Sequence, residues 1–375
     1  MVLTAFQKTP LGLTRKSVDA LVQSLIGNLV GIKDNSGEFL LKLEDGSVVD
    51  TKGWHDWEWT HGVGLYGLWM YYEMTQDPKT LEVMQDWFQR RFSEPPRHKN
   101  INTMAVFSTL AYLYEHTNDK TYLPYLDAWG EWAMYDLERT DFGGMQHITY
   151  MAANTQQLWD DTLMMTVLPL AKIGKLLNRP HYIDEAKRQF LVHIKYLMDC
   201  KSGLFYHGWC FENGGHHFAE AFWGRGNSWI TIVIPEFIEL LDLPPTDPIR
   251  IHLIDTLKAQ VDALAKYQDP KSGLWHTLID DADSYLESSA TAGFAFGVLK
   301  AIRKKYLDKS YEAMALKAVQ GVMDNIDANG ELQQCSFGTP MGDTKQFYKD
   351  IPITSMPYGQ AMAMMSLVEL LRRFY

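Results

Sequence analysis

Helical periodicity dominates the pattern of apolar and polar positions along the chain. Apolar residues recur every three or four positions in runs that are separated by short polar turns. These runs predict twelve helices, at residues 14–29, 60–76, 78–93, 102–117, 120–138, 159–177, 181–199, 227–242, 247–267, 285–306, 310–326 and 357–374. The turns at 74–79, 116–122, 178–182 and 307–311 resemble one another, so the helices are read as six antiparallel pairs. In each turn an Asn or Asp is expected to end one helix and to cap the next.

A second recurring pattern follows several of the second helices. The segments 141–147, 201–207 and 271–276 each place a Gly before a short run that ends in His. Gly supplies the turn and a short extended run follows it. These loops are expected to bring His and aromatic side chains to one end of the assembly.

Six repeated hairpins form either an open solenoid or a closed ring. The first helices of the pairs are richer in small and apolar residues, as at 62–67 and 290–297, whereas the second helices carry more charge, as at 185–188. This difference predicts an all-α (α/α)6 barrel with an inner and an outer ring. No Ser/Gly-rich linker interrupts the series, so residues 1–375 are expected to form a single domain. The rim at the starts of the inner helices is expected to hold Trp59, His61, Asn102, Asp161, Arg225, Asn227, Trp229, Ser288 and Tyr358.

The charge and composition of the chain exclude some classes of binding partner and cellular location. The formal net charge is −11, and no basic stripe offsets it, which argues against nucleic acid and anionic membranes as partners. The three cysteines lie in no CxxC arrangement and are expected to be reduced. The first residues carry no apolar signal segment, and no run approaches 18 apolar residues, so a cytoplasmic protein is expected.

The stretch Leu158–Met165 places two adjacent carboxylates, Asp160 and Asp161, at the predicted start of an apolar helix. Side chains at i and i+1 on a helix point about 100° apart, so these two cannot both face one pocket. One of them is therefore expected to be a solvent-side cap, because acids are favoured in a first helical turn.

The stretch Phe222–Trp229 sets Arg225 between two glycines, and Arg can clamp a carboxylate in a bidentate fork. The spacing of His207, His216 and His217 matches no standard metal site. No phosphate-binding loop and no GxSxG elbow is present. What remains is acid–base chemistry by carboxylates in a funnel rich in aromatic residues, which is typical of carbohydrate chemistry.

At this point the motifs match a known family. The chain resembles the unsaturated glucuronyl and rhamnogalacturonyl hydrolases, glycoside hydrolase families 88 and 105, and is most similar to the rhamnogalacturonyl branch of family 105. The motifs that carry this resemblance are Trp59–Val63, Gly143-Gly144 with His147, Trp159 with Asp161, Leu204–His207, Trp223–Trp229 and Tyr285–Ser289. The resemblance implies an (α/α)6 barrel, in agreement with the helix pairs.

The resemblance also implies a reaction. Family members hydrate the C4=C5 double bond of a terminal unsaturated uronic acid, here expected to be an unsaturated galacturonyl group on rhamnogalacturonan oligosaccharides. Asp161 corresponds to the catalytic Asp, which would protonate C4 and then accept a proton from water. Burial among Trp159, Met164 and Met165 is expected to favour its protonated form. Asp160 then keeps the role of a first-turn or outward-facing acid.

The partner implied by the resemblance is a small unsaturated oligosaccharide, and neither a metal nor a cofactor is expected. The residues that the resemblance assigns to substrate binding are Trp59, His61, Asn102, His147, Trp159, His207, Trp223, Arg225 and Trp229. At one position the chain departs from the pattern, because better-described relatives carry Asp where this chain has Asn102. An amide still binds a sugar hydroxyl, but it cannot titrate as a second carboxylate.

Three other functions fit parts of the sequence. An inverting glycosidase on the same barrel would need a second carboxylate opposite Asp161, for which Glu220 and Glu287 are candidates. A sugar 2-epimerase would use paired His bases drawn from His147, His207 and His276. A non-catalytic toroid would bind an oligosaccharide or a protein through its aromatic rim.

Overall fold

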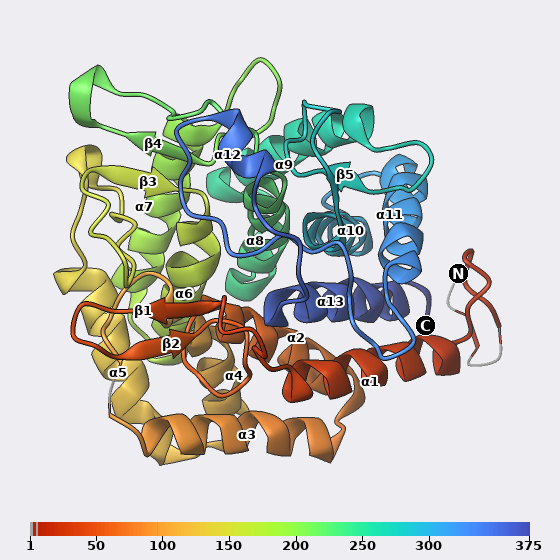
Figure 1. The fold of residues 1–375 in the computed structure, drawn as a ribbon, viewed down its shortest axis with the longest axis horizontal. Helices are drawn as coiled ribbons and strands as arrows, with labels where there is room; N and C mark the ends of the chain where they lie inside the picture. Colours follow the sequence, from red (N-terminus) through yellow and green to blue (C-terminus); the bar gives the residue numbers. More distant parts are fainter. Residues whose placement is uncertain (1–2, 5–6, 96) are drawn as a thin grey trace. The chain divides into compact units, whose positions relative to one another are not determined.

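The structure is a computed structural model that describes residues 3–4, 7–95 and 97–375 (Figure 1). Helices make up most of the described chain: α1 (Arg15–Gly31), α2 (Trp59–Thr75), α3 (Pro78–Phe92), α4 (Phe107–Thr117), α5 (Leu123–Glu131), α6 (Leu168–Leu176), α7 (Pro180–Leu197), α8 (Gly224–Leu241), α9 (Pro248–Tyr267), α10 (Ser288–Arg303), α11 (Glu312–Asp324), α12 (Lys345–Lys349) and α13 (Pro357–Phe374). Six short strands form three two-stranded antiparallel pairs: β1 (Leu40–Lys42) with β2 (Val48–Asp50), β3 (Gln157–Trp159) with β4 (Gly208–Cys210), and β5 (Trp275–His276) with β6 (Leu286–Glu287). The predicted all-α class is therefore confirmed.

Three of the four predicted turns have an Asp that caps the next helical segment, at Asp77, Asp119 and Asp308. Asp77 accepts hydrogen bonds from the backbone N–H groups of Lys79 and Thr80, and Asp308 accepts one from Ser310. The residues that end the preceding helices, Gln76 and Asn118, adopt the left-handed conformation, with φ of 57° and 56°. One polar turn thus stops a helix and starts the next, as the sequence predicted.

Three of the predicted helices are less regular than expected. Residues 102–117 begin as a 3₁₀ turn, η1 (Thr103–Val106), before α4. The helix predicted at 120–138 likewise starts with a 3₁₀ turn and ends in a π-helical turn, Trp132–Asp136. The helix predicted to start at residue 159 is preceded by strand β3, and its first turns are the π-helical η5 (Leu163–Val167). Such π turns often lie at functional sites.

The chain divides into two compact units. The first comprises residues 1–31, 198–207 and 218–375, and the second comprises residues 32–197 and 208–217.

In the second unit, α2 is the most deeply buried helix, and all its residues from Thr60 to Tyr72 are buried. It packs against α3, α4 and η1, while α6 packs against α4, α5 and α7. Contact with η1 is close, because a Cβ added at Gly62 would lie 2.6 Å from the Cβ of Ala105. Only glycine fits at that position without displacing the neighbouring chain.

In the first unit, α10 occupies the centre and packs against α8, α11 and α13. Its charged end is neutralised internally, since Lys300 pairs with Glu236 and Arg303 pairs with Glu369. The Lys300–Glu236 pair is buried on both sides, and buried charges of this kind are tolerated only when each has a partner. Within the described residues, no helix is both long and apolar enough to cross a membrane.

Candidate functional site

Asp161 is the first helical residue after strand β3. Strand β3 pairs with β4 so that Leu158 lies opposite Trp209 and Trp159 lies opposite Gly208. The chain then turns at Asp160, and the helix that continues through η5 into α6 begins at Asp161. Asp161 is 9% exposed, which keeps it mostly shielded from water.

The expectation that Asp160 faces outward is wrong, because this residue is fully buried. The prediction assumed that both carboxylates lie on one helix, so that a 100° rotation separates them. Asp160 instead occupies the turn between strand and helix, where that rotation does not apply. The two acids are thus neighbours in a buried turn.

His147 and Trp159 form a stacked pair beside this turn. Their ring centroids are 4.2 Å apart, and the planes differ by 10°. His147 Nδ1 lies 2.9 Å from the hydroxyl of Thr162, and the indole N–H of Trp159 donates to Gln157 Oε1 at 3.0 Å. The segment before β3 and the start of the helix therefore hold each other in place around Asp161.

Asn102 is half-buried at the start of η1. Its backbone N–H donates to the side chain of Asn100 at 2.9 Å. The preceding residue, Ile101, receives a hydrogen bond from Thr166 Oγ1 and donates one to the carbonyl of Ile148, both at 3.0 Å. These bonds place Asn102 next to the segments that carry His147 and Asp161.

Sequence reasoning missed Glu58, a carboxyl that is buried at the start of α2. Glu58 caps α2 and accepts from the backbone N–H of Trp59 at 2.6 Å. Burial raises its pKa to about 8, although the hydrogen bonds from Asn102 and from the first turn of the helix work in the opposite direction. The sequence signal was an acid directly before an apolar run, which is the usual mark of a helix cap.

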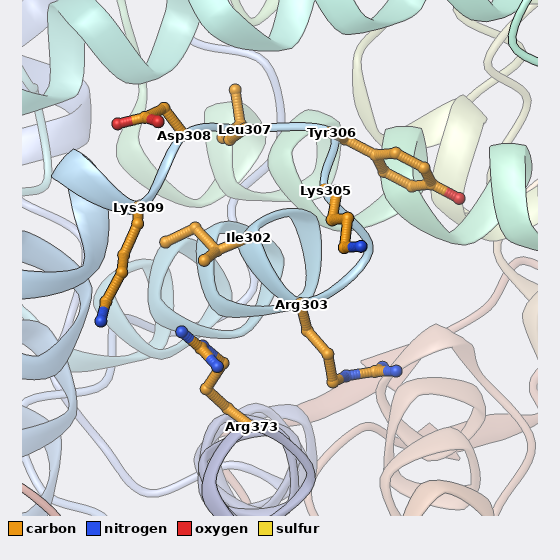
Figure 2. Close-up of a pocket in the computed structure, with 8 residues that line it drawn as sticks. All are labelled: Ile302, Arg303, Lys305, Tyr306, Leu307, Asp308, Lys309 and Arg373. Carbon is orange, nitrogen blue, oxygen red and sulfur yellow. The ribbon is translucent and has the colours of Figure 1, made fainter. Parts of the chain in front are cut away.

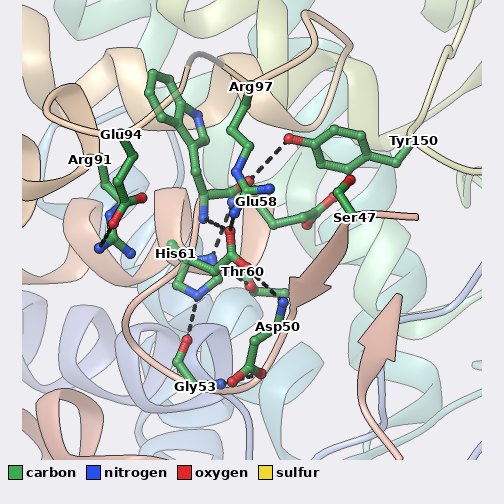
Figure 3. A network of polar contacts seen from close by, with 12 residues as sticks. Ser47, Asp50, Gly53, Glu58, Thr60, His61, Arg91, Glu94, Arg97 and Tyr150 are labelled. Carbon is green, nitrogen blue, oxygen red and sulfur yellow. Dashed lines mark hydrogen bonds and ion pairs between the residues drawn. The ribbon is translucent and has the colours of Figure 1, made fainter. Parts of the chain in front are cut away.

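His61 has a structural role in this network (Figure 3). Its Nε2 lies 2.6 Å from the carbonyl oxygen of Gly53, and its Nδ1 lies 3.1 Å from the backbone nitrogen of Glu58. Because a carbonyl only accepts, Nε2 carries the proton and Nδ1 accepts from Glu58. Burial lowers the pKa of the ring, which favours this neutral form. Both ring nitrogens of His61 thus contact backbone atoms. The neighbouring Trp59 is half-buried.

The remaining predicted site residues belong to the first unit. His207 Nδ1 lies 2.7 Å from the hydroxyl of Tyr348, and its ring centroid lies 4.3 Å from that of Trp223. Trp223 and Tyr348 share a buried cluster with Ala221 and Leu278. Trp229 is also fully buried, in the second turn of α8.

Arg225 anchors a loop. Its guanidinium donates to the carbonyl oxygens of Ser336 and Phe337, both at 3.0 Å, and to Thr339 Oγ1 at 3.1 Å. It lies over the rings of Trp223 and Tyr358, 4.6 and 4.8 Å from their centroids. The sequence suggested that this guanidinium binds a carboxylate of a ligand. In the structure it donates hydrogen bonds to backbone carbonyls of residues 336 and 337.

The two candidates for a second glycosidase carboxylate differ from what such a role needs. Glu220 is exposed. Glu287 caps α10, and its carboxylate accepts from the backbone of Ser289, Ala290 and Ser336. The carboxylate of Glu287 is thus occupied by backbone donors, and Glu220 is open to solvent, which disfavours a conventional inverting mechanism that uses either residue.

An open pocket of about 590 Å³ lies near the carboxyl end of α10 (Figure 2). Its lining residues are Ile302, Arg303, Lys305, Tyr306, Leu307, Asp308, Lys309 and Arg373. None of them is a predicted site residue. Its two arginines are paired with carboxylates, Arg303 with Glu369 and Arg373 with Glu312, so their charges are compensated.

Comparison with known proteins agrees with the resemblance seen in the sequence. Residues 31–374 match the family model for Glycosyl Hydrolase Family 88. The chain is 30% identical over 319 residues to the unsaturated rhamnogalacturonyl hydrolase YesR of Bacillus subtilis, covering 84% of this chain and 90% of that protein.

Solved structures agree as well. A protein of Salmonella enterica, described as a possible member of the GH105 family, is 57% identical over the whole of both chains, with a TM-score of 0.95. The unsaturated glucuronyl hydrolase of Bacillus sp. GL1 is 19% identical over 95% of this chain and 97% of that one, with a TM-score of 0.71, and shows the shared fold. The (α/α)6 class predicted from the helix pairs is thereby confirmed. The chain belongs to glycosyl hydrolase family 88.

Proposed function

We propose that this protein removes a terminal 4,5-unsaturated uronic acid, an unsaturated galacturonyl group, from rhamnogalacturonan oligosaccharides. The similarity to YesR along 84% of the chain supports this substrate class. The observation that carries the chemistry is the position of Asp161, which is largely buried at the start of a helix and next to the stacked rings of His147 and Trp159.

In this reaction Asp161 carries the proton. Its protonated carboxyl delivers the proton to C4 while positive charge develops at C5 and on the ring oxygen. Water then adds to C5 and gives up a proton to the carboxylate, which restores the acid. The product is a hemiketal that opens without further catalysis and releases the remaining sugar. The sequence of steps needs no covalent enzyme intermediate, metal or cofactor.

Other residues bind and orient the substrate. The flat pair of Trp159 and His147 suits the face of an unsaturated ring, because both rings offer apolar surface with polar edges. Asn102 offers an amide and Trp59 a half-buried indole. His61 contributes by holding Glu58 and the start of α2.

The residues of the first unit are assigned similar supporting roles. His207 and Trp223 are assigned to substrate binding, and their contacts with each other and with Tyr348 fix their orientation. Arg225 and Trp229 are buried and keep the surrounding loops in place. The small oligosaccharides that this reaction consumes fit a cytoplasmic location, which we include in the proposal.

The experiment is a panel of lyase-generated disaccharides that carry an unsaturated uronyl group on rhamnose or on other sugars. Hydrolysis is followed by loss of ultraviolet absorbance from the double bond, and saturated analogues are run in parallel. We expect the fastest loss with the rhamnose-linked substrate and no release from saturated analogues. Hydrolysis of the saturated analogues alone would replace this proposal with a conventional glycosidase.

A further inference from the structure

Phe142 lies in a tight turn of the second unit, Asp141–Gly143. It is 67% exposed, the largest fraction among the large apolar residues of the described chain. Its backbone has φ of 62° and ψ of 8°, in the left-handed region where glycine is favoured and a bulky side chain is rare. The chain thus holds an aromatic ring in solvent at a position that strains its backbone.

The turn is held in this shape from two distant segments. Arg188 of α7 donates to the carbonyl oxygens of Phe142 and Gly143 at 2.8 and 2.7 Å. The backbone N–H of Asp141 donates to Gln156 Oε1 at 2.7 Å. A strained backbone persists only where surrounding contacts fix it, and such residues cluster at functional sites. Strain that is maintained by tertiary hydrogen bonds thus indicates a role for the exposed ring.

Three aromatic rings meet at this turn. The centroid of the Phe142 ring lies 5.7 Å from those of Tyr196, on α7, and Phe211, which follows β4. Tyr196 and Phe211 are half-buried, and their centroids are 4.8 Å apart. Trp209 of β4 adds a fourth ring, 5.8 Å from that of Tyr196. We call Phe142, Tyr196 and Phe211 the aromatic platform, because together they present flat apolar surface to solvent.

Basic side chains border the aromatic platform. The ammonium of Lys195, an exposed residue of α7, lies 5.4 and 5.0 Å from two of the ring centroids. The side chain of Arg188, which holds the turn, is 46% exposed. Two exposed acids, Asp141 and Glu212, are next to the rings in the sequence. Because the chain carries a formal net charge of −11, an anionic ligand is attracted here through such local cations.

The aromatic platform lies at one end of the β3–β4 ribbon. The backbone N–H of Phe211 donates to the carbonyl oxygen of Gln156, directly before β3, at 3.0 Å. Trp159 follows three residues later, which is roughly 10 Å along an extended strand. Leu158 lies opposite Trp209, and side chains alternate between the faces of a strand, so Trp159 and Trp209 point to opposite sides. The platform is therefore near the candidate site but separate from it.

We propose that the aromatic platform is a second binding site, which holds a sugar unit of an acidic oligosaccharide away from Asp161. The inference rests on the proposed function only for the class of sugar. The apolar face of a deoxy sugar such as rhamnose packs flat against an aromatic ring, and a neighbouring uronyl carboxylate is attracted to Lys195. Substrates longer than a disaccharide are thereby retained beside the candidate site.

The test is equilibrium binding of a saturated rhamnogalacturonan hexasaccharide, which the proposed reaction does not consume, measured by titration calorimetry. Phe142→Gly removes the ring and suits the left-handed backbone, so the turn should keep its shape. We expect its Kd to be about fivefold that of wild type. Lys195→Met should also weaken binding, by a factor that shrinks as salt is added. The matched control is Tyr135→Ala, which removes another ring of the second unit that is 62% exposed and should bind as wild type does.

Three results overturn the inference: no binding of the hexasaccharide by wild type, a Kd of folded Phe142→Gly equal to that of wild type, or an equal loss in Tyr135→Ala. A wild-type dimer that dissociates in Phe142→Gly, as measured by sedimentation, would also overturn it, because a second copy of the chain would then cover the aromatic platform. Lys195→Met decides the matter if circular dichroism shows that Phe142→Gly fails to fold. Binding through the platform without turnover of any unsaturated substrate would overturn the proposed function and leave this inference standing.

Discussion

The imidazole of His147 lies parallel to the indole of Trp159, with 4.2 Å between ring centroids and 10° between planes. The stack is held from both sides, since His147 Nδ1 lies 2.9 Å from Thr162 Oγ1 and Trp159 Nε1 donates to Gln157. Thr162 follows Asp161 directly, so the orientation of the stack and that of the carboxyl are set by the same turn.

Removing the hydroxyl that holds His147 tests this relationship. Thr162→Val keeps the shape of the fully buried side chain but removes one of the contacts that orient the imidazole. We expect kcat/KM on the unsaturated disaccharide to fall about fivefold, for a hydrogen bond worth about 1 kcal/mol.

The matched control is Thr256→Val, which removes a buried hydroxyl bonded to His252 within α9. Equal losses of activity in the two variants would show that the effect is general destabilisation and would contradict the role given to Thr162.

Replacing Arg225 is expected to act on stability first. Arg225→Met removes the guanidinium hydrogen bonds to the carbonyls of Ser336 and Phe337 and should lower the free energy of unfolding by about 2–4 kcal/mol in urea titrations. Arg225→Lys keeps the charge but not the planar fork and should recover only part of that loss. The exposed Lys79→Met serves as control. A variant of full stability with raised KM alone would assign Arg225 to the substrate instead.

Glu58 should make folding less favourable as pH rises. The ordinary pKa of its carboxyl is 4.5, and burial raises it to about 8 in the folded protein. Between these values the unfolded chain releases a proton that the folded protein retains, so stability falls with increasing pH, by at most about 5 kcal/mol. Melting temperatures measured from pH 5 to 8.5 should therefore favour Glu58→Gln over wild type increasingly toward the alkaline end. Parallel curves for the two proteins would contradict a protonated Glu58.

His193 should have the opposite effect. It is fully buried on α7, donates through Nδ1 to the carbonyl of Gln189, and burial lowers its pKa from 6.5 to about 4. As pH falls through this window the unfolded chain takes up a proton that the folded protein does not, which costs up to about 3 kcal/mol.

Unfolding by urea at pH 7 and at pH 4.5 measures this cost. His193→Gln should lose less stability than wild type between the two pH values, whereas the exposed His252→Gln should behave as wild type does. A loss in His193→Gln as large as that of wild type would show that another group is responsible.

The helical framework could be predicted because its signals are local. Asp77, Asp119 and Asp308 cap helices where polar turns interrupt the apolar period, and Gly203 and Gly273 turn the chain with φ of 87° and 77°. Each of these features depends on a few neighbouring residues, so periodicity and turn chemistry were enough to find it.

The details around the candidate site depend on contacts between distant segments. Strand β3 forms because β4, some fifty residues later, pairs with it, and this pairing moves Asp160 from a helix face into a buried turn. The start of α2, with Glu58 as its cap, meets η1 only through tertiary packing. Arg225 likewise reaches residues more than a hundred positions away. No local pattern encodes such pairings.

The central claim is that Asp161 carries the proton in hydration of the double bond. The most direct measurement is turnover of an unsaturated uronyl–rhamnose disaccharide by wild type and Asp161→Asn, followed as loss of ultraviolet absorbance, with the exposed Asp184→Asn as control. We predict that Asp161→Asn loses at least about a thousandfold in kcat while it remains folded and binds the substrate, and that the control turns over as wild type does. Near-normal turnover by folded Asp161→Asn would contradict the claim.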